Sequence, residues 1–229
     1  QQDAVLARVG ASAGKIYSFR HVFNGFAARM TPLQAARLRK DKSVLQVWED
    51  QAMALDHDNS PRFLGLLNKG QGLRARHGLR GEDIIIGVMD SGIVQEHPSL
   101  DPTGFGPPPA GWAGACEAGD GFAATDCNNK LIGARFYVDG FGAGNVVPTE
   151  FLSPRDSDGH GTHTATTAAG NENVQAVLAG KPVATISGIA PRARVAVYKV
   201  CWQAPGAPTS SCFFSDSAAA TEQAFADLG

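Results

Sequence analysis

Two short segments of the chain carry residue types that could perform nucleophilic catalysis. Asp90 begins an Asp-Ser-Gly segment after an apolar run, and His160 is the first histidine of an Asp-Gly-His-Gly-Thr-His segment. A serine hydroxyl is a weak nucleophile until an imidazole removes its proton, and that imidazole needs a carboxylate to fix its tautomer. Acid, then histidine, then serine is one chain order in which such a triad occurs. The segments therefore predict Asp90 as the acid and His160 as the base of a hydrolase.

The elements around these residues predict that they can meet. Residues 84–90 form a continuous apolar run, typical of a parallel strand that is covered on both faces. Asp90 ends this run, and open α/β sheets place their active sites at the carboxyl ends of strands. Residues 160–169 predict a helix that begins at His160. The positive end of that helix disfavours the imidazolium and a carboxylate favours it, so we expect a base that is available near neutral pH.

The rest of the second half predicts an α/β domain. A Gly-, Pro- and Asn-rich excursion occupies residues 98–154, and residues 194–200 predict a further interior strand. Ser215 and Asp216 can cap a last helix. Its apolar positions have helical spacing and are Ala219, Ala220, Ala224, Phe225 and Leu228. Strand, helix, strand and helix in this order predict a parallel sheet with right-handed crossovers.

The first 55 residues predict a small α+β unit. Residues 15–19 and 25–30 alternate as two strands around an Asn-Gly turn, and residues 44–48 read as another strand. Thr31 provides a helix N-cap before a proline. The expected helix extends to about Lys40 with an apolar stripe of Leu33, Ala36 and Leu38. A unit this short buries little core, so we expect it to depend on a neighbouring region for stability.

Composition excludes several classes of protein. The net charge of −2 gives no field that would hold nucleic acid or an anionic membrane. No apolar run approaches the length of about 20 residues that crosses a bilayer. The first ten residues lack the pattern of a signal peptide, and the chain does not begin with Met, so we expect the natural N-terminus and any targeting signal to lie upstream.

Four cysteines form two local pairs along the chain. Cys116 and Cys127 are one pair, and Cys201 and Cys212 are the other. Neither pair has the Cys-x-x-Cys spacing of a zinc site, which favours two small disulfide loops made in an oxidising compartment. Four unrelated buried thiols are the alternative.

The motifs together resemble a known family, the subtilisin-like serine proteases or subtilases. The resemblance rests on Val-Met-Asp-Ser-Gly-Ile around Asp90, Asp-Gly-His-Gly-Thr-His-Thr-Ala around His160, and Gly-Ile-Ala-Pro at residues 188–191. Residues 63–66, 127–135 and 198–202 are most similar to the cucumisin-like branch. That branch has its cysteine pairs where this chain has Cys116 with Cys127 and Cys201 with Cys212. The resemblance implies a subtilisin-like α/β domain in which Asp90 and His160 are catalytic, preceded by a small ferredoxin-like α+β propeptide of the inhibitor I9 type.

The resemblance also implies a division of the chain. Residues 1–57 would be the propeptide, 58–80 a processing linker and mature N-terminal segment, and 81–229 the first part of the protease domain. The polar boundary predicts propeptide cleavage close to four residues, His57, Asp58, Asn59 and Ser60. The expected partners are protein or peptide substrates and the propeptide itself, as intramolecular chaperone and inhibitor. We expect a secreted protein that is a monomer when complete.

The chain lacks two blocks that the family pattern includes. No Gly-Thr-Ser segment and no oxyanion-hole asparagine block occur in the 229 residues, and Ser91, Ser157 and Ser187 do not lie at a matching helix start. We therefore expect a C-terminally truncated serine endopeptidase precursor, inactive alone, whose substrate-pairing strand also lies beyond Gly229. The alternative is a non-catalytic product that acts as an inhibitory or binding module through residues 15–55.

Metal and cofactor sites are not expected. His163 with Asp156 or Asp158 could form a metallohydrolase site, but the sequence has no His-Glu-x-x-His motif and no third histidine nearby. We interpret His163 as a packed helix residue. Residues 156–159 resemble a calcium loop without its late glutamate, so a structural turn is the better interpretation. Calcium occurs in the family, but no calcium site is identified in this sequence.

Overall fold

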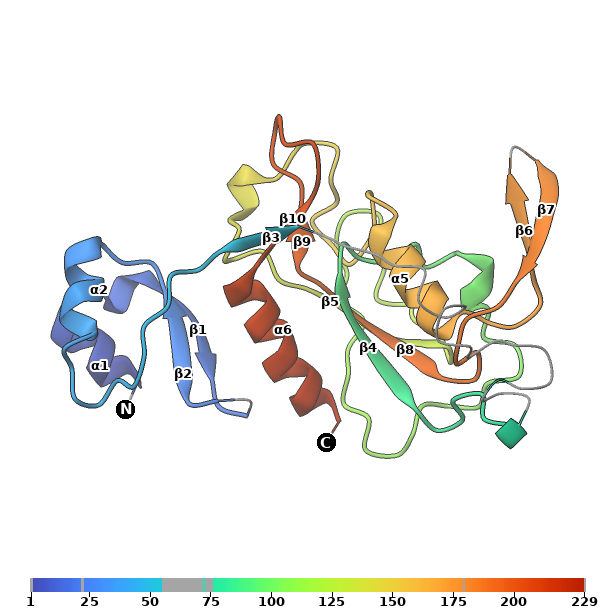
Figure 1. The fold of residues 1–229 in the computed structure, drawn as a ribbon, viewed down its shortest axis with the longest axis horizontal. Coiled ribbons are helices and arrows are strands. Elements are labelled where there is room, and N and C mark those ends of the chain that lie inside the picture. Colours follow the sequence, from blue (N-terminus) through green and yellow to red (C-terminus); the bar gives the residue numbers. More distant parts are fainter. Residues whose placement is uncertain (1, 22, 55–71, 73–75, 179, 229) are drawn as a thin grey trace.

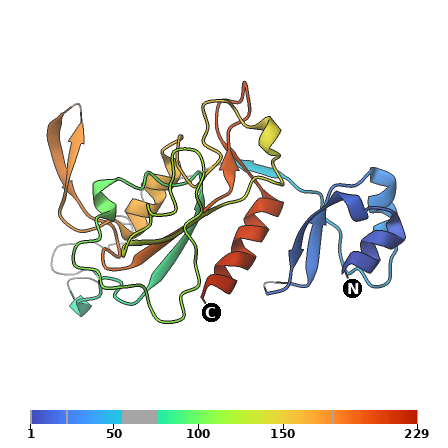
Figure 2. The ribbon, with the colours of Figure 1, turned by 180° about the vertical axis from the view of Figure 1, so that it is seen from behind.

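The computed structural model describes residues 2–228 except 22, 55–71, 73–75 and 179. Two regions are visible in Figure 1: a small N-terminal unit, coloured blue, and a larger α/β region. The helix α6 (Phe214–Asp227) stands between them in this view and in the opposite one (Figure 2).

The α/β region is built on a parallel sheet, as the sequence predicts. The sheet has the order β4-β8-β5, formed by β4 (Ile85–Asp90), β8 (Arg194–Lys199) and β5 (Leu131–Phe136). Both neighbours of β8 run parallel to it, and Asp90 pairs in register with Lys199 at the carboxyl ends of their strands. Helix α5 (His160–Ala169) begins at the predicted residue.

The hydrophobic core occupies both faces of β8. Val195 and Val197 pack in one cluster with Ala165 and Ala169 of α5, whereas Ala196 and Tyr198 belong to a second cluster. Side chains alternate between the faces of a strand, so a strand with a helix on each side reads as an unbroken apolar run. The prediction of an interior strand is confirmed for β8.

Three predictions for this region are wrong in detail. β4 is not covered on both faces, because Gly87 and Met89 are exposed. β5 lies inside the predicted irregular excursion of residues 98–154. Ser215 and Asp216 lie in the first turn of α6 and do not cap it. Asp50 instead accepts a hydrogen bond of 3.0 Å from the Ser215 amide.

The N-terminal unit contains two helices and a hairpin. They are α1 (Gln2–Val9), β1 (Lys15–Phe19), β2 (Gly25–Ala28) and α2 (Pro32–Leu38). The β1–β2 pairing and the Thr31 cap of α2 are confirmed. Sequence reasoning missed α1, although its buried residues Val5, Leu6 and Val9 share helical spacing.

The predicted stripe of α2 and the strand at residues 44–48 are wrong. Leu33 and Ala36 are exposed, and only Leu38 reaches the core. Residues 44–48 have no strand partner among the described residues, because Val44 and Val47 pack three positions apart on the α1 core instead of alternating across a sheet. The strand of this part of the chain is β3 (Ala52–Ala54).

β3 joins the N-terminal unit to a second sheet. It pairs antiparallel with β10 (Ser211–Phe213), which pairs in turn with β9 (Cys201–Trp202). Cys201 and Cys212 lie opposite each other in the β9–β10 ladder and form a disulfide. Cys116 and Cys127 form the second disulfide, so both predicted pairs are present.

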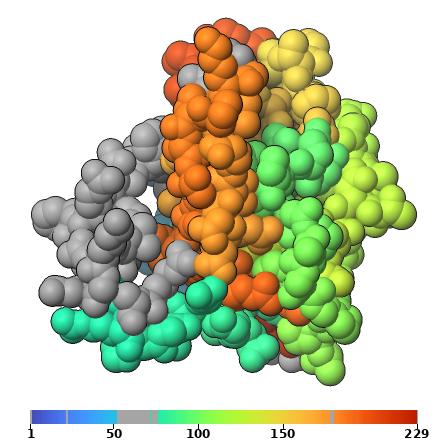
Figure 3. Space-filling view, turned by 90° about the vertical axis from the view of Figure 1, so that its right-hand side faces the viewer, coloured from blue at the N-terminus to red at the C-terminus, as the bar shows by residue number. Residues whose placement is uncertain are grey.

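Smaller elements complete the fold. The hairpin of β6 (Val174–Leu178) and β7 (Lys181–Ile186), in orange, extends outward from the α/β region in Figure 1 and lies in front of it in Figure 3. Short 3-10 helices are η1 (Ser12–Gly14), η2 (Pro98–Leu100) and η3 (Ala143–Asn145). No helix in the described parts of the chain has both the length and the apolar composition needed to cross a bilayer.

Candidate active site

The structure brings Asp90 and His160 together. The Nδ1 atom of His160 lies 2.8 Å from Oδ1 and 3.1 Å from Oδ2 of Asp90. Their side chains are 14% and 7% exposed, so the contact is largely shielded from water. A carboxylate at Nδ1 fixes the imidazole tautomer and directs Nε2 toward the reacting group. The pair therefore has the geometry of an oriented general base.

Close backbone packing places His160 at the end of β4. Gly159, which precedes it, has φ +91°, a left-handed conformation that favours glycine. A Cβ atom on Gly161 would lie 2.3 Å from the carbonyl oxygen of Gly92. The glycines around the histidine thus permit the first turn of α5 to pack on the turn that follows Asp90.

Asp156 connects the acid segment to the start of α5. Its Oδ1 accepts hydrogen bonds from Ser91 Oγ at 2.9 Å and from the amides of Asp158 and Gly159. Its Oδ2 accepts from the amide and the hydroxyl of Thr162. Burial raises the pKa of Asp156, but these hydrogen bonds outweigh it and hold the pKa below the ordinary value. Asp156 therefore acts as a cap for α5 from outside the helix.

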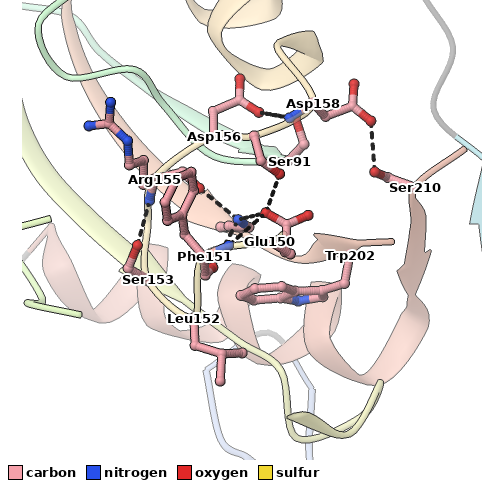
Figure 4. A network of polar contacts seen from close by, with 12 residues as sticks. Ser91, Glu150, Phe151, Leu152, Ser153, Arg155, Asp156, Asp158, Trp202 and Ser210 are labelled. Atoms are coloured by element: carbon pink, nitrogen blue, oxygen red, sulfur yellow. Dashed lines mark hydrogen bonds and ion pairs between the residues drawn. The ribbon is translucent and has the colours of Figure 1, made fainter. Parts of the chain in front are cut away.

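A buried ion pair lies below this turn. Lys199 Nζ is 2.7 Å from Glu150 Oε1, and the two side chains are 0% and 1% exposed. Figure 4 shows Glu150 together with Arg155, Asp156 and the ring of Trp202. Lys199 Nζ lies 4.4 Å from the centre of that ring. Burial lowers the pKa of Lys199, and the Glu150 carboxylate opposes this effect.

The N-terminal unit contacts the α/β region through α6. Tyr17 donates a hydrogen bond of 2.7 Å from its hydroxyl to Asp216 Oδ1, and Phe19 packs with Ala218 and Ala219. The amides of Arg20 and His21 donate to Glu222. These contacts agree with the expectation that the unit depends on a neighbouring region for stability.

The other predicted residues have different outcomes. The processing region of His57, Asp58, Asn59 and Ser60 lies outside the described residues. His163 is exposed, unlike the packed residue that the sequence predicts, because the buried face of α5 carries Gly161, Thr162, Ala165 and Ala169. Within the described ranges, no group of three His, Cys, Asp or Glu side chains could hold a metal ion.

Sequence reasoning missed Lys199 and Glu150 as parts of the site. A lysine inside an apolar strand is a usable signal, because lysine is almost never fully buried unless it is paired. The partner of Lys199 could not be predicted from the sequence, because Glu150 lies 49 positions away in an irregular segment.

Comparison with known proteins agrees with this geometry. A family model described as the subtilase family matches residues 81–212, and a model described as peptidase inhibitor I9 matches residues 2–56. The chain is similar to two proteins of Arabidopsis thaliana. One is subtilisin-like protease SBT1.4, which is 44% identical over 93% of this chain and 27% of the relative. The other is subtilisin-like protease SBT1.7, which is 42% identical over 98% of this chain and 29% of the relative.

The chain thus spans less than a third of the length of these relatives. The subtilase model nevertheless covers more than half of the chain, and the inhibitor I9 model covers the region before it. The chain therefore belongs to the subtilase family of serine proteases, with an inhibitor I9-type propeptide region ahead of its protease region.

Proposed function

We propose that this chain is part of a serine endopeptidase precursor that hydrolyses peptide bonds, with Asp90 as the acid and His160 as the base of its triad. The observation that carries the proposal is the 2.8 Å contact between His160 Nδ1 and Asp90 Oδ1. The full-length protein would supply the nucleophilic serine and the oxyanion-hole asparagine. No cofactor is required for this chemistry.

Each proton in the reaction would pass through His160. Nε2 would take the proton of the serine hydroxyl as the oxygen attacks the peptide carbonyl, and would return it to the leaving amine. Asp90 would hold Nδ1–H and stabilise the imidazolium without being protonated. A water molecule activated in the same way would then release the acyl group from the serine.

The N-terminal unit would act on the same site as an inhibitor. β3 is an extended segment paired with β10, and it leads directly into the predicted processing region. An added strand of this kind is bound by main-chain hydrogen bonds, as peptide substrates are bound at sheet edges. β10 thus takes the role of a substrate-pairing strand, which sequence reasoning placed beyond Gly229. The two disulfides favour secretion, since such bonds persist in oxidising compartments.

The decisive experiment replaces the base in the full-length protein. His160→Ala should abolish both removal of the propeptide and cleavage of casein. His163→Ala is the matched control, because His163 lies three positions later on α5 with an exposed side chain. This control should process normally. Normal processing by His160→Ala would show that His160 is not the base.

A second candidate, a non-catalytic inhibitory module, is favoured by the contacts of the N-terminal unit with α6. A serine-directed fluorophosphonate separates the two functions. The full-length endopeptidase should be labelled stoichiometrically, and the label should fall with His160→Ala. An inhibitory module would remain unlabelled, both as the 229 residues and as the full-length protein, and it would still inhibit a related protease.

A further inference from the structure

The buried pair Lys199–Glu150 is not used in the proposed chemistry. Both side chains are essentially without contact to water, with 0% and 1% exposure. Removing two charges from water costs several kcal/mol for each ion, and well-packed apolar residues often replace such a pair without loss of stability. Stability alone therefore does not explain these residues, and their other contacts must be considered.

Those contacts hold the chain segment that leads to the start of α5, where His160 lies. Lys199 Nζ donates to the carbonyl oxygen of Arg155 at 2.6 Å and to that of Phe151 at 3.2 Å. Glu150 Oε1 accepts a hydrogen bond from Ser157 Oγ and one from the amide of Phe151. The pair thus holds the main chain at Phe151 and Arg155, and the side chain of Ser157, at the end of β8.

This segment and β8 both connect to the acid and the base. Lys199 pairs in register with Asp90, and the amide of Val200, the residue that follows β8, donates to the Asp90 carbonyl oxygen at 2.9 Å. Arg155 precedes Asp156, whose carboxylate holds Ser91 and the first turn of α5. Movement of the Arg155 carbonyl would therefore move the group that places His160 against Asp90.

We propose that Lys199 and Glu150 are positioning residues, which hold the segment 151–157 so that His160 stays aligned on Asp90. The proposal rests on the proposed peptidase function for its kinetic consequences. A misplacement of about 1 Å can lower a rate by roughly a hundredfold. An apolar pair of similar volume would fill the same space but could not bind the Arg155 and Phe151 carbonyls. Replacing the ion pair with an apolar pair therefore separates its effect on stability from its effect on the alignment of His160.

The test compares two double variants in the full-length protein. Glu150→Leu with Lys199→Met should keep the unfolding midpoint near that of the wild type, lower kcat by about ten- to a hundredfold and leave KM unchanged. The Nδ1 proton resonance of His160, assigned by its loss in His160→Ala, should shift or broaden. Arg135→Met with Asp227→Leu is the matched control. It removes another largely buried ion pair of 2.9 Å near the same sheet, and it should change neither kcat nor the resonance.

The outcomes distinguish the two proposals. If the wild type cleaves no peptide, the proposed function fails, while the resonance still reports the alignment of His160. If the Leu-Met variant keeps both kcat and the resonance, the positioning role is wrong. If that variant does not fold, Glu150→Gln keeps the shape and one acceptor but removes the charge. It should produce a smaller change of the same resonance, and an unchanged resonance would contradict the proposal.

Discussion

Two buried carboxylates, one in the protease region and one at its boundary with the N-terminal unit, differ in how their negative charge is stabilised. Asp156 lies just before α5 and Asp216 lies where the N-terminal unit meets α6, and both are 5% exposed or less. Burial raises the pKa of both groups, but the net effects are opposite: the pKa of Asp156 is below its ordinary value and that of Asp216 is above it.

The difference comes from the hydrogen bonds that each carboxylate accepts. Asp156 receives five, all from Ser91 and from residues 158–162 within the protease region. Asp216 receives three, from the amides of Gly140 and Phe141 and from the Tyr17 hydroxyl, and the nearby Asp50 charge disfavours its ionisation. The Asp156 anion is therefore stabilised from within the protease region, whereas the Asp216 anion on α6 depends partly on the N-terminal unit.

The largest effect is expected for Asp156→Ala. Hydrogen bonds to a charged group contribute about 1.5–3 kcal/mol each and are not additive, so we expect the free energy of unfolding to fall by about 3 kcal/mol or more. Urea denaturation measures the loss. Asp156→Asn, which keeps one carbonyl acceptor, should lose less. An alanine variant within about 1 kcal/mol of the wild type would contradict the role of Asp156 as an external cap.

The two carboxylates should also respond to pH in opposite directions. The folded-state pKa of Asp156 is depressed, so its contribution is fully present above about pH 4 and is lost as the pH falls through the folded value. The folded-state pKa of Asp216 is raised, so stability is lost as the pH rises from about 4 through the folded value. Comparing each Asn variant with the wild type by urea denaturation across this range isolates the two contributions. Parallel curves would remove the contrast.

A smaller effect is expected for Tyr17→Phe at the α6 boundary. Asp216 would keep its two amide donors and lose one hydroxyl donor, at a cost of about 1.5 kcal/mol. Amides of β1 should then exchange with solvent roughly tenfold faster in native-state hydrogen exchange. Tyr198→Phe is the control, because its hydroxyl donates to Asp227 at 2.9 Å away from this boundary. Equal acceleration of β1 exchange by both variants would argue against a specific Tyr17 contact.

The same contrast explains which features the sequence could predict. Asp90, His160, α5 and β8 were predictable because an unbroken apolar run and a glycine-rich helix start are local signals. The Glu150–Lys199 pair and the bond from Ser91 to Asp156 connect distant segments, and only the folded chain brings these residues together.

The N-terminal unit was predicted less well for a physical reason. Its core is small, so few positions must be apolar, and periodicity is a weak guide to which side chains are buried. Of the predicted stripe of α2, only Leu38 is in the core, and the predicted strand 44–48 contributes Val44 and Val47 at three-residue spacing.

The smallest effect is expected at an apolar residue of this unit that has no partner in its core. Leu45 is 99% exposed, whereas Leu38 is 3% exposed. Leu45→Ser should therefore change the free energy of unfolding by no more than about 0.5 kcal/mol, and Leu38→Ala should lower it by about 2–5 kcal/mol. Hydrogen exchange of the α1 amides, which pack on the same core, reports both values. A large loss for Leu45→Ser would mean that this leucine contacts a further surface, and the unit would then depend on more than α6, the β3–β10 pairing and its own small core.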